Sequence, residues 1–447
     1  MEGNLTKGPI LKTLTKLAIP IMASSFLGTL YNITDMAWIG LLGSKAVAGV
    51  GVGGMFTWLS QGLAAMARMG GQVHVAQCLG RGDKEQAHRY AKTAVQLSIL
   101  LGLAFAAVSL LFTDPLVGFF KLEGVKTILD AKIYMRITCG LILFSFLNLT
   151  LTGVYTAQGD SKTPFVANFI GLLINLLLDP LLILGVGPFP RIEVAGAAVA
   201  TVSAQFVVMF VMMVGVFRSK KEENVLKGIR LFEPFSKEEL GNICKIGGPT
   251  AIQGMVYCMI SMVLTRMVAA FGAEAIATQR VGGQIESVSW NTADGFAAAL
   301  NAFVGQNYGA KKMDRVQKGY RISFWTVAIW GALIMLAFII FPGPIAGVFF
   351  HEEKAMEIAI SYLIIIGFSE AFMCVELMTI GALSGLGKTK LCSVISITAT
   401  SMRIPLAMVL SRTSLGLDGI WWALTLTSVA KGIIFYLTFR YQMREKC

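Results

Sequence analysis

Long apolar stretches follow one another along the whole chain, separated by short segments rich in polar and charged residues. A helix needs about 20 residues to cross the apolar core of a bilayer. Twelve stretches reach this length, so the pattern predicts twelve membrane-spanning helices and an all-α integral membrane protein. The predicted spans are residues 14–40, 46–73, 93–112, 131–157, 163–185, 194–217, 243–271, 275–303, 322–341, 356–384, 391–411 and 416–439.

The composition supports this class. Hydrophobic residues make up 55% of the chain and charged residues 14%, and the mean hydropathy is +0.68. A soluble domain carries about 25% charged residues. The polar opening residues and the length of the first apolar run are unlike a cleavable signal peptide, so none is expected.

The formal net charge of +12 has a simple explanation. Cytoplasmic loops of membrane proteins collect Lys and Arg. If the N-terminus is cytoplasmic, the inner segments hold 25 of these residues and the outer segments 7. We therefore expect both termini in the cytoplasm, a multi-pass protein of the cytoplasmic membrane, and no nucleic-acid partner.

The two halves of the chain repeat each other at a nearly constant offset, which differs by only one position along the repeat. The matched pairs are Pro20 and Pro249, Gly43 and Gly272, Gln77 and Gln306, Gly80 and Gly309, Gly159 and Gly387, and Lys162 and Lys390. Six helices per half give both halves the same orientation, as in transporters built from parallel repeats. The predicted domains are residues 1–217, a cytoplasmic linker at 218–242, and residues 243–447. Ser236 and Glu239 form a capping-box pattern that predicts a short surface helix in the linker.

The repeat breaks at several polar positions within the predicted spans. The unlike pairs are Asp35 with Leu264, Asn148 with Glu376, Asn175 with Arg403, and Asp179 with Ala407. Chemistry that depends on Asp35, Asn175 and Asp179 is therefore expected in the first half only.

The first predicted span carries Pro20 early and Asp35 late. An acid inside a spanning helix costs at least about 2.5 kcal/mol, so it normally faces an interior and marks an ion or proton pathway. In the alternative, the helix ends sooner and Asp35 lies among lipid headgroups. The apolar residues 36–39 argue against that reading.

The predicted span at 163–185 carries a second acid. Asn175 and Asp179 are four positions apart and share one helix face. Pro180 cannot donate a hydrogen bond to the carbonyl of Leu176, which must be satisfied inside the protein. This combination predicts a site that handles a proton or a cation.

Asp35 and Asp179 are expected at similar depths, and Asn148 and Thr201 could reach the same level. Two close carboxylates in a low dielectric cannot easily both ionise, so one should bind a proton. Two other interpretations remain open. The same oxygens could hold Na⁺ at Asp35, Asn175 and Asp179, or the cluster could be a polar network that only packs the helices.

The second half has charges of both signs within its predicted spans. Because opposite signs are present, we interpret these residues first as structural ion pairs and only secondarily as functional residues. They are Arg266, Glu286, Asp294, Glu370, Glu376 and Arg403. The seven cysteines form no CxxC pair, and neither a metal centre nor a cofactor is expected. Many of the 22 methionines lie in spans, where they could form an adaptable wall for varied apolar ligands.

Other protein classes have weaker support in the sequence. Residues 387–389 resemble the end of a phosphate-binding loop, but Ala382 replaces the required glycine and the setting is a turn between membrane helices. Residues 80–84 faintly resemble a loop of the major facilitator superfamily, so the fold of that superfamily remains an alternative interpretation. No HExxH or suitably placed GxSxG motif suggests an intramembrane enzyme. A flippase for lipids or lipid-linked oligosaccharides is a further alternative.

The chain resembles the multidrug and toxic compound extrusion (MATE) family, and within it the DNA-damage-inducible F (DinF-like) branch of bacteria and archaea. The resemblance covers essentially the whole chain. The motifs that carry it are LAIPIMASSFLGTLYNITDMAWIG at 17–40, the repeated VxQxxG motif at 75–80 and 304–309, TAQGDSKTP at 156–164, and INLLLDPLLI at 174–183.

The resemblance implies two six-helix bundles that work by alternating access as an antiporter for amphipathic, often cationic, drugs and dyes. It implies that Asp35 is the key protonation site, supported by Asn148, Asn175, Asp179 and Thr201, and that the first helix bends at Pro20. The Na⁺-using branch carries an acid early in helix seven, and the stretch at 250–259 has none. We also expect Tyr31 and Met36 beside Asp35 to contact substrate, H⁺ as the coupling ion with Na⁺ possible, and a monomer.

Overall fold

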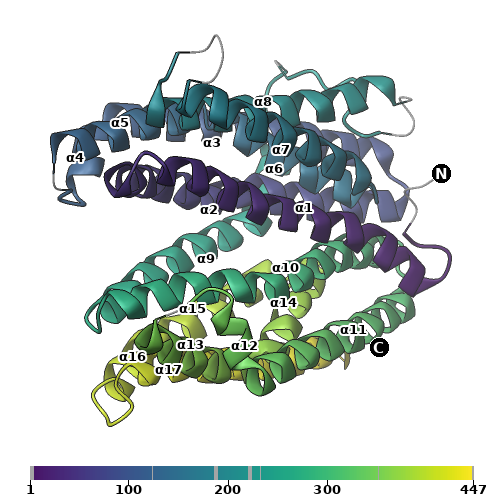
Figure 1. Ribbon diagram of the computed structural model, residues 1–447. Coiled ribbons are helices and arrows are strands. Elements are labelled where there is room, and N and C mark those ends of the chain that lie inside the picture. The colour runs from purple at the N-terminus through teal and green to yellow at the C-terminus, as the bar shows by residue number, and fades with distance from the viewer. Residues whose placement is uncertain are drawn as a thin grey trace. The chain divides into compact units, whose positions relative to one another are not determined.

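The computed structural model describes residues 5–122, 124–185, 190–219, 224–231, 233–350 and 352–444 (Figure 1). Within these ranges all regular secondary structure is helical, which confirms the predicted all-α class. The helices of the first half are α1 (Ile10–Gly40), α2 (Ser44–Arg81), α3 (Lys84–Leu111), α4 (Thr113–Gly118), α5 (Val125–Gly140), α6 (Leu143–Ala157), α7 (Lys162–Ile183) and α8 (Glu193–Arg218). Those of the second half are α9 (Lys237–Ala269), α10 (Ala273–Gly309), α11 (Met313–Ile340), α12 (Pro342–Gly347), α13 (Glu353–Gly367), α14 (Glu370–Gly385), α15 (Thr389–Ser401), α16 (Arg403–Leu410) and α17 (Leu417–Arg444).

The described helices account for the twelve predicted spans. Eight spans are long and apolar enough by themselves, counting α15 and α16 as one. Two more are helix pairs bent at a short break, α5 with α6 by 45° and α13 with α14 by 51°. The remaining two are α2 and α10, of 38 and 37 residues, whose polar residues lower their hydropathy. The short helices α4 and α12 were not predicted, and they occupy corresponding places in the two halves.

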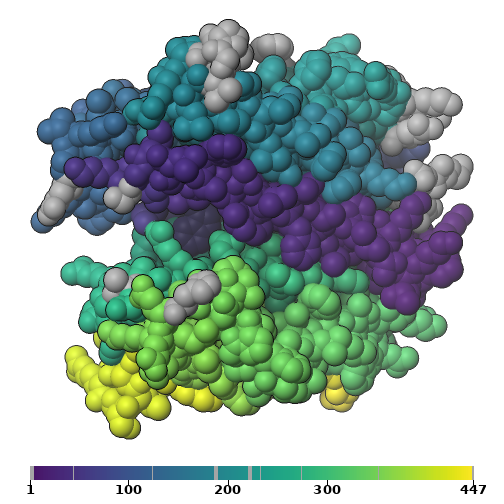
Figure 2. All heavy atoms as spheres, in the orientation of Figure 1, coloured from purple at the N-terminus to yellow at the C-terminus, as the bar shows by residue number. Residues whose placement is uncertain are grey.

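The described residues pack into two compact units. The first is Ala23–Gly254, and the second combines Leu5–Met22 with residues 255–444. Each unit has its own core of buried hydrophobic side chains. The atoms that cover these cores on one face are drawn in Figure 2. These units group residues that pack together, whereas the predicted domains follow the order of the chain. The predicted domains at residues 1–217, 218–242 and 243–447 therefore stay a prediction.

Two helices pass from one unit to the other. The start of α1 belongs to the second unit because Leu14 and Leu17 are buried in its core with Phe303 and Phe435. The start of α9 belongs to the first unit, where Ile243 is buried. Pro20 lies within α1, shortly before the chain enters the first unit at Ala23, and α1 runs through it as one helix.

The described part of the linker, which excludes residues 220–223 and 232, lies against α3. His88 Nδ1 is 2.7 Å from the carbonyl oxygen of Val225. Gln96 Nε2 donates to the carbonyls of Leu231 and Glu233 at 2.9 and 2.7 Å. The predicted short surface helix is wrong as a separate element, because residues from Lys237 onward form the first turns of α9.

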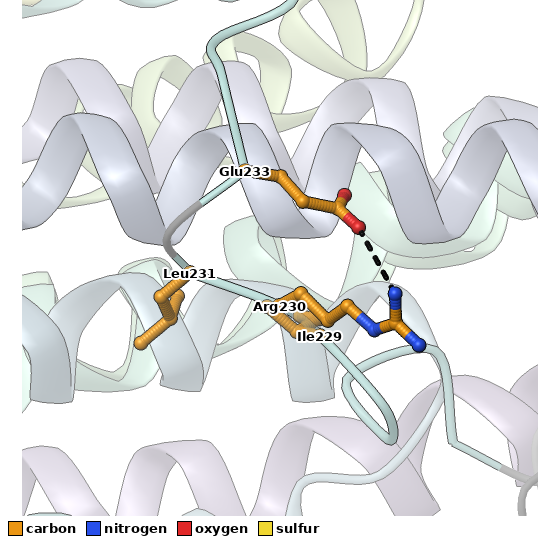
Figure 3. A pocket seen from close by; sticks show the side chains of 4 residues that line it. All are labelled: Ile229, Arg230, Leu231 and Glu233. Atoms are coloured by element: carbon orange, nitrogen blue, oxygen red, sulfur yellow. Dashed lines mark ion pairs between the residues drawn. The ribbon is translucent and has the colours of Figure 1, made fainter.

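A shallow cavity of about 510 Å³ opens beside this linker, lined by Ile229, Arg230, Leu231 and Glu233 (Figure 3). The Glu233 carboxylate is 3.8 Å from Arg230 and 2.8 Å from Lys92 Nζ. The hydrogen bond and charge of Lys92 hold the pKa of Glu233 below its usual range. The linker is therefore fixed to the first unit by backbone and side-chain contacts together.

Candidate functional site

Three of the predicted site residues meet within the first unit. Asp35 on α1 is 7% exposed, and Asn175 and Asp179 on α7 are fully buried. Asn175 Nδ2 donates to Asp179 Oδ1 at 3.2 Å, which their spacing of one helical turn permits. The carboxylates of Asp35 and Asp179 lie within electrostatic range of each other. The structure thus brings together the two acids that the sequence places on different helices.

The α7 helix continues past Pro180 to Ile183. Pro180 has no N–H, so it gives no helical hydrogen bond to the carbonyl of Leu176. The carbonyl oxygen of Leu176, which therefore lacks its helical donor, lies next to the Asn175–Asp179 pair. The backbone and two side chains therefore present oxygen atoms on the same turn of α7.

Hydroxyl groups complete the cluster. Tyr31 lies one turn before Asp35 on α1, and Tyr134 comes from α5; both interact electrostatically with Asp35 and Asp179. Thr201 of α8 lies beside both tyrosines. Sequence reasoning missed Tyr134. The repeat offers a signal for it, because the offset that relates the two halves pairs Tyr134 with Tyr362.

Several oxygen atoms of this cluster are buried without a hydrogen-bond partner in the described part of the protein. They are Tyr31 OH, Asp35 Oδ1, Asn175 Oδ1, Asp179 Oδ2 and Thr201 Oγ1. No described Lys or Arg forms a salt bridge with either acid. Buried polar groups without partners are costly, and buried charges normally need pairing. The arrangement is suited to binding a proton or a small cation.

Asn148 of α6 lies on a neighbouring part of the same unit. Its Nδ2 donates to the backbone oxygen and to Oε1 of Gln205, both at 2.8 Å. Gln205 is one turn after Thr201 on α8, and sequence reasoning missed it. Asn148 is thus connected to the cluster through α8 and not through a direct bond to either acid.

The other predicted site residues have different surroundings. Met36 follows Asp35 but is 37% exposed, because successive helical residues point about 100° apart. Pro20 lies on the part of α1 that packs in the second unit. The roles predicted for Met36 in binding and for Pro20 in bending stay predictions.

In the second unit, charges of opposite sign pair as expected at some positions. Lys431 Nζ is 2.8 Å from Glu376 Oε1, with both side chains buried. Sequence reasoning missed Lys431, which lies in α17. Arg403 donates to Thr427 and Ser428 at 3.0 and 2.9 Å and interacts electrostatically with Glu286. Arg266 is exposed.

Known proteins similar to this chain are membrane transporters. A probable multidrug resistance protein NorM of Thermotoga maritima is 29% identical, over 97% of this chain and 94% of its own. A probable multidrug resistance protein YoeA of Bacillus subtilis is 25% identical over 99% and 96%. A crystal structure of a MATE protein in a straight conformation has a TM-score of 0.89 at 24% identity, covering 99% and 98%, and shares the fold.

The MatE family model matches residues 20–181 and again residues 249–409. The first match begins at Pro20 and the second at its repeat partner Pro249, which confirms the predicted repeat. Together they cover well over half of the chain. Membership of the DNA-damage-inducible F branch stays a prediction. The chain is a multi-pass protein of the cytoplasmic membrane, a transporter and not an enzyme, and it belongs to the MATE family.

Proposed function

We propose that this transporter is a secondary multidrug efflux antiporter, which exports amphipathic or cationic organic compounds in exchange for protons. The relatives described as probable multidrug resistance proteins support the substrate class. The observation that carries the coupling is the pair of buried acids, Asp35 and Asp179, without a basic partner in the described residues.

The coupling follows from the charge of this pair. With both carboxylates ionised, the repulsion between them is not offset by a fixed positive charge. One proton removes that repulsion, and the protonated acid can donate to an oxygen of Asn175, Thr201 or the other acid. Asp35 is on α1, so this rearrangement acts on the part of α1 that follows Pro20.

In the outward-facing state, Asp35 or Asp179 takes up a proton, the hydrogen bonds around Asn175 change, and α1 bends near Pro20. The space available to the drug in the first unit decreases and the drug leaves. Release of the proton to the cytoplasm resets the carrier. This transport cycle is alternating access with one ion site.

The driving force is sufficient. One elementary charge moving across 100 mV is worth about 2.3 kcal/mol. One pH unit adds about 1.4 kcal/mol. One proton could therefore sustain a several-hundred-fold gradient of a neutral compound, whereas a univalent cation exchanged for one proton gains only the pH contribution.

Na⁺ is the second candidate for the coupling ion. The orphaned oxygens of Tyr31, Asp35, Asn175, Asp179 and Thr201 favour it, because hard cations bind carboxylate, amide and hydroxyl oxygens. The same cluster would then hold Na⁺ in place of the proton.

Transport in liposomes decides between these ions. The purified protein is reconstituted, and efflux of a fluorescent lipophilic cation is followed under an imposed pH gradient and then under an imposed Na⁺ gradient. Efflux driven by the pH gradient and lost in Asp35→Asn supports the proposal. Efflux driven by Na⁺ alone replaces the proton with Na⁺ at the same site, and no efflux under either gradient points to a lipid substrate.

A further inference from the structure

Two corresponding helices, α3 and α11, have different surroundings at the same positions. Each has 28 residues, and the repeat pairs them from end to end. It pairs Lys92 with Arg321 and Gln96 with Trp325. These residues lie where the predicted spans of the two helices begin, on the side that the distribution of Lys and Arg assigns to the cytoplasm.

In the first unit the linker covers these positions. The Glu233 carboxylate is 2.8 Å from Lys92 Nζ, and the Lys92 side chain is 14% exposed. Gln96 Nε2 donates to the carbonyls of Leu231 and Glu233. The basic residue of α3 therefore has a negative partner from the linker, at the boundary of the membrane.

In the second unit the corresponding positions are open. Arg321 is exposed, and Trp325 is 61% exposed. Within the described part of the chain, no acid forms a salt bridge with Arg321. The positive charge of α11 thus lacks the partner that Glu233 provides on α3.

A row of aromatic rings connects this part of α11 with a second arginine, on α17. The Trp325 ring meets the Phe324 ring edge to face with centroids 5.5 Å apart, and Phe324 lies 5.1 Å from Tyr436. The guanidinium of Arg440 lies 5.9 Å from the centroid of the Tyr436 ring, and Arg440 is exposed. Together with Arg321 these residues form one surface, the α11–α17 seam.

The seam continues into the membrane as an apolar surface. On α11, the exposed residues Ile329 and Leu333 follow Trp325 at intervals of one helical turn. On α17, the exposed residues Ile433 and Leu437 lie within two turns before Arg440. Exposed apolar side chains at this depth contact lipid chains. The seam therefore combines a basic end at the headgroup level with an apolar surface below it.

The charges beside the seam also favour an anion. Lys318 lies about one turn before Arg321, and Arg444 lies one turn after Arg440; both are exposed. The only acid of α11, Asp314, lies two turns before Arg321 and is exposed. The field at the seam is therefore positive.

We propose that the α11–α17 seam binds an anionic phospholipid of the cytoplasmic leaflet, with the phosphate held by Arg321 and Arg440 and the acyl chains along the apolar surface. Guanidinium groups donate paired hydrogen bonds to phosphate oxygens, and basic sites between helices on the cytoplasmic side bind anionic headgroups. Trp and Tyr rings are suited to the headgroup level. The phosphate gives α11 the negative partner that Glu233 gives α3. This inference does not rest on the proposed drug export or its coupling ion, since the lipid is a bound component of the transporter.

Native mass spectrometry of the delipidated protein in detergent measures this binding directly. The protein is titrated with dioleoylphosphatidylglycerol and, separately, with dioleoylphosphatidylcholine, and the ratio of the two dissociation constants gives the preference. One basic residue near an anionic membrane surface is worth about a fivefold preference. Arg321→Gln combined with Arg440→Gln should therefore lower the preference for phosphatidylglycerol roughly twentyfold. Trp325→Gln, which introduces the residue that α3 has at this position, should weaken binding of both lipids and leave the preference unchanged.

The matched control is Lys388→Gln combined with Lys390→Gln. It removes two exposed positive charges from the same end of the second unit, at the start of α15, and should keep the wild-type preference. The single variants Arg321→Gln and Arg440→Gln keep the experiment informative if their combination does not fold.

Three outcomes would overturn the proposal. The first is an unchanged preference in a folded protein that carries both arginine substitutions. The second is an equal loss of preference in the lysine control, which would assign the effect to overall charge. The third is arginine-dependent binding of inorganic phosphate without binding of phosphatidylglycerol, which would assign the seam to a soluble anion.

Discussion

The two units share a packing arrangement, but they differ in the charged and polar residues that it holds. In both, a tyrosine ring packs where a glycine leaves no side chain: Tyr134 against Gly53, and Tyr362 against Gly282. Each tyrosine lies beside an acid, the buried Asp35 in the first unit and the partly buried Glu286 in the second.

The difference lies in the basic residues. Asn175 in the first unit corresponds to Arg403 in the second, by the offset that relates the two halves. Asn175 donates to Asp179 without a charge, whereas Arg403 places a permanent positive charge near Glu286. A duplicated fold therefore keeps its packing while several substitutions, Asn175 to Arg403 among them, change how buried negative charge is placed and compensated.

The most severe test removes the acid of α1. We expect Asp35→Asn to abolish drug export, because the amide cannot take up and release a proton. The measurement is efflux from liposomes under a pH gradient, with insertion and thermal stability compared with the wild type. Efflux at the wild-type rate would move the coupling site away from Asp35.

A second test makes the first unit resemble the second. In Asn175→Arg, a fixed positive charge beside Asp179 should keep both carboxylates ionised, so efflux driven by a pH gradient should fall at least tenfold. Asn175→Gln is the matched control, since it enlarges the side chain without adding charge. Equal efflux by the two variants would show that the charge is not what distinguishes the units.

A third test concerns the fixed ion pair of the second unit. Glu376→Gln leaves Lys431 buried without its partner, and breaking a buried pair from one side costs about 3–5 kcal/mol. We expect a lower unfolding temperature but retained efflux, and partial recovery of stability in the double variant Glu376→Gln with Lys431→Met. Complete loss of transport by a folded Glu376→Gln protein would place the coupling in the second unit.

The smallest effect is expected outside the membrane, at the linker. The pKa of Glu233 is lowered in the folded state by Lys92, so the stabilisation from this pair is present above the ordinary pKa of glutamate. It is lost as the pH falls through the lower, folded-state pKa. Lys92→Ala should remove this pH dependence and modestly increase proteolysis within residues 224–236, with Glu353→Gln as the control. If proteolysis is the same at every pH in the wild type and in Lys92→Ala, the contacts of Gln96 and His88 are sufficient to hold the linker against α3.

Much of the fold and part of the candidate site could be predicted from the sequence. The twelve apolar spans and the shared helix face of Asn175 and Asp179 depend on neighbours along the chain. The repeat is found by comparing one half of the sequence with the other. Tyr134, Gln205 and Lys431 were missed because each acts on a residue of another helix. The surface helix in the linker was predicted incorrectly because a capping pattern marks where a helix begins but not how long it continues.

The sequence by itself determined the class and the number of spans, because hydrophobic length is a local property. It also determined the internal repeat, because the order of residues in one half can be compared directly with that in the other. It also identified the acids, since a charge within an apolar span is conspicuous in any context. Only the tertiary structure decided which of these charges are compensated. Glu376 and Glu370 lie on the same helix, yet the first meets Lys431 and the second meets no base. Compensation depends on distances between helices, and the order of residues along the chain does not contain those distances.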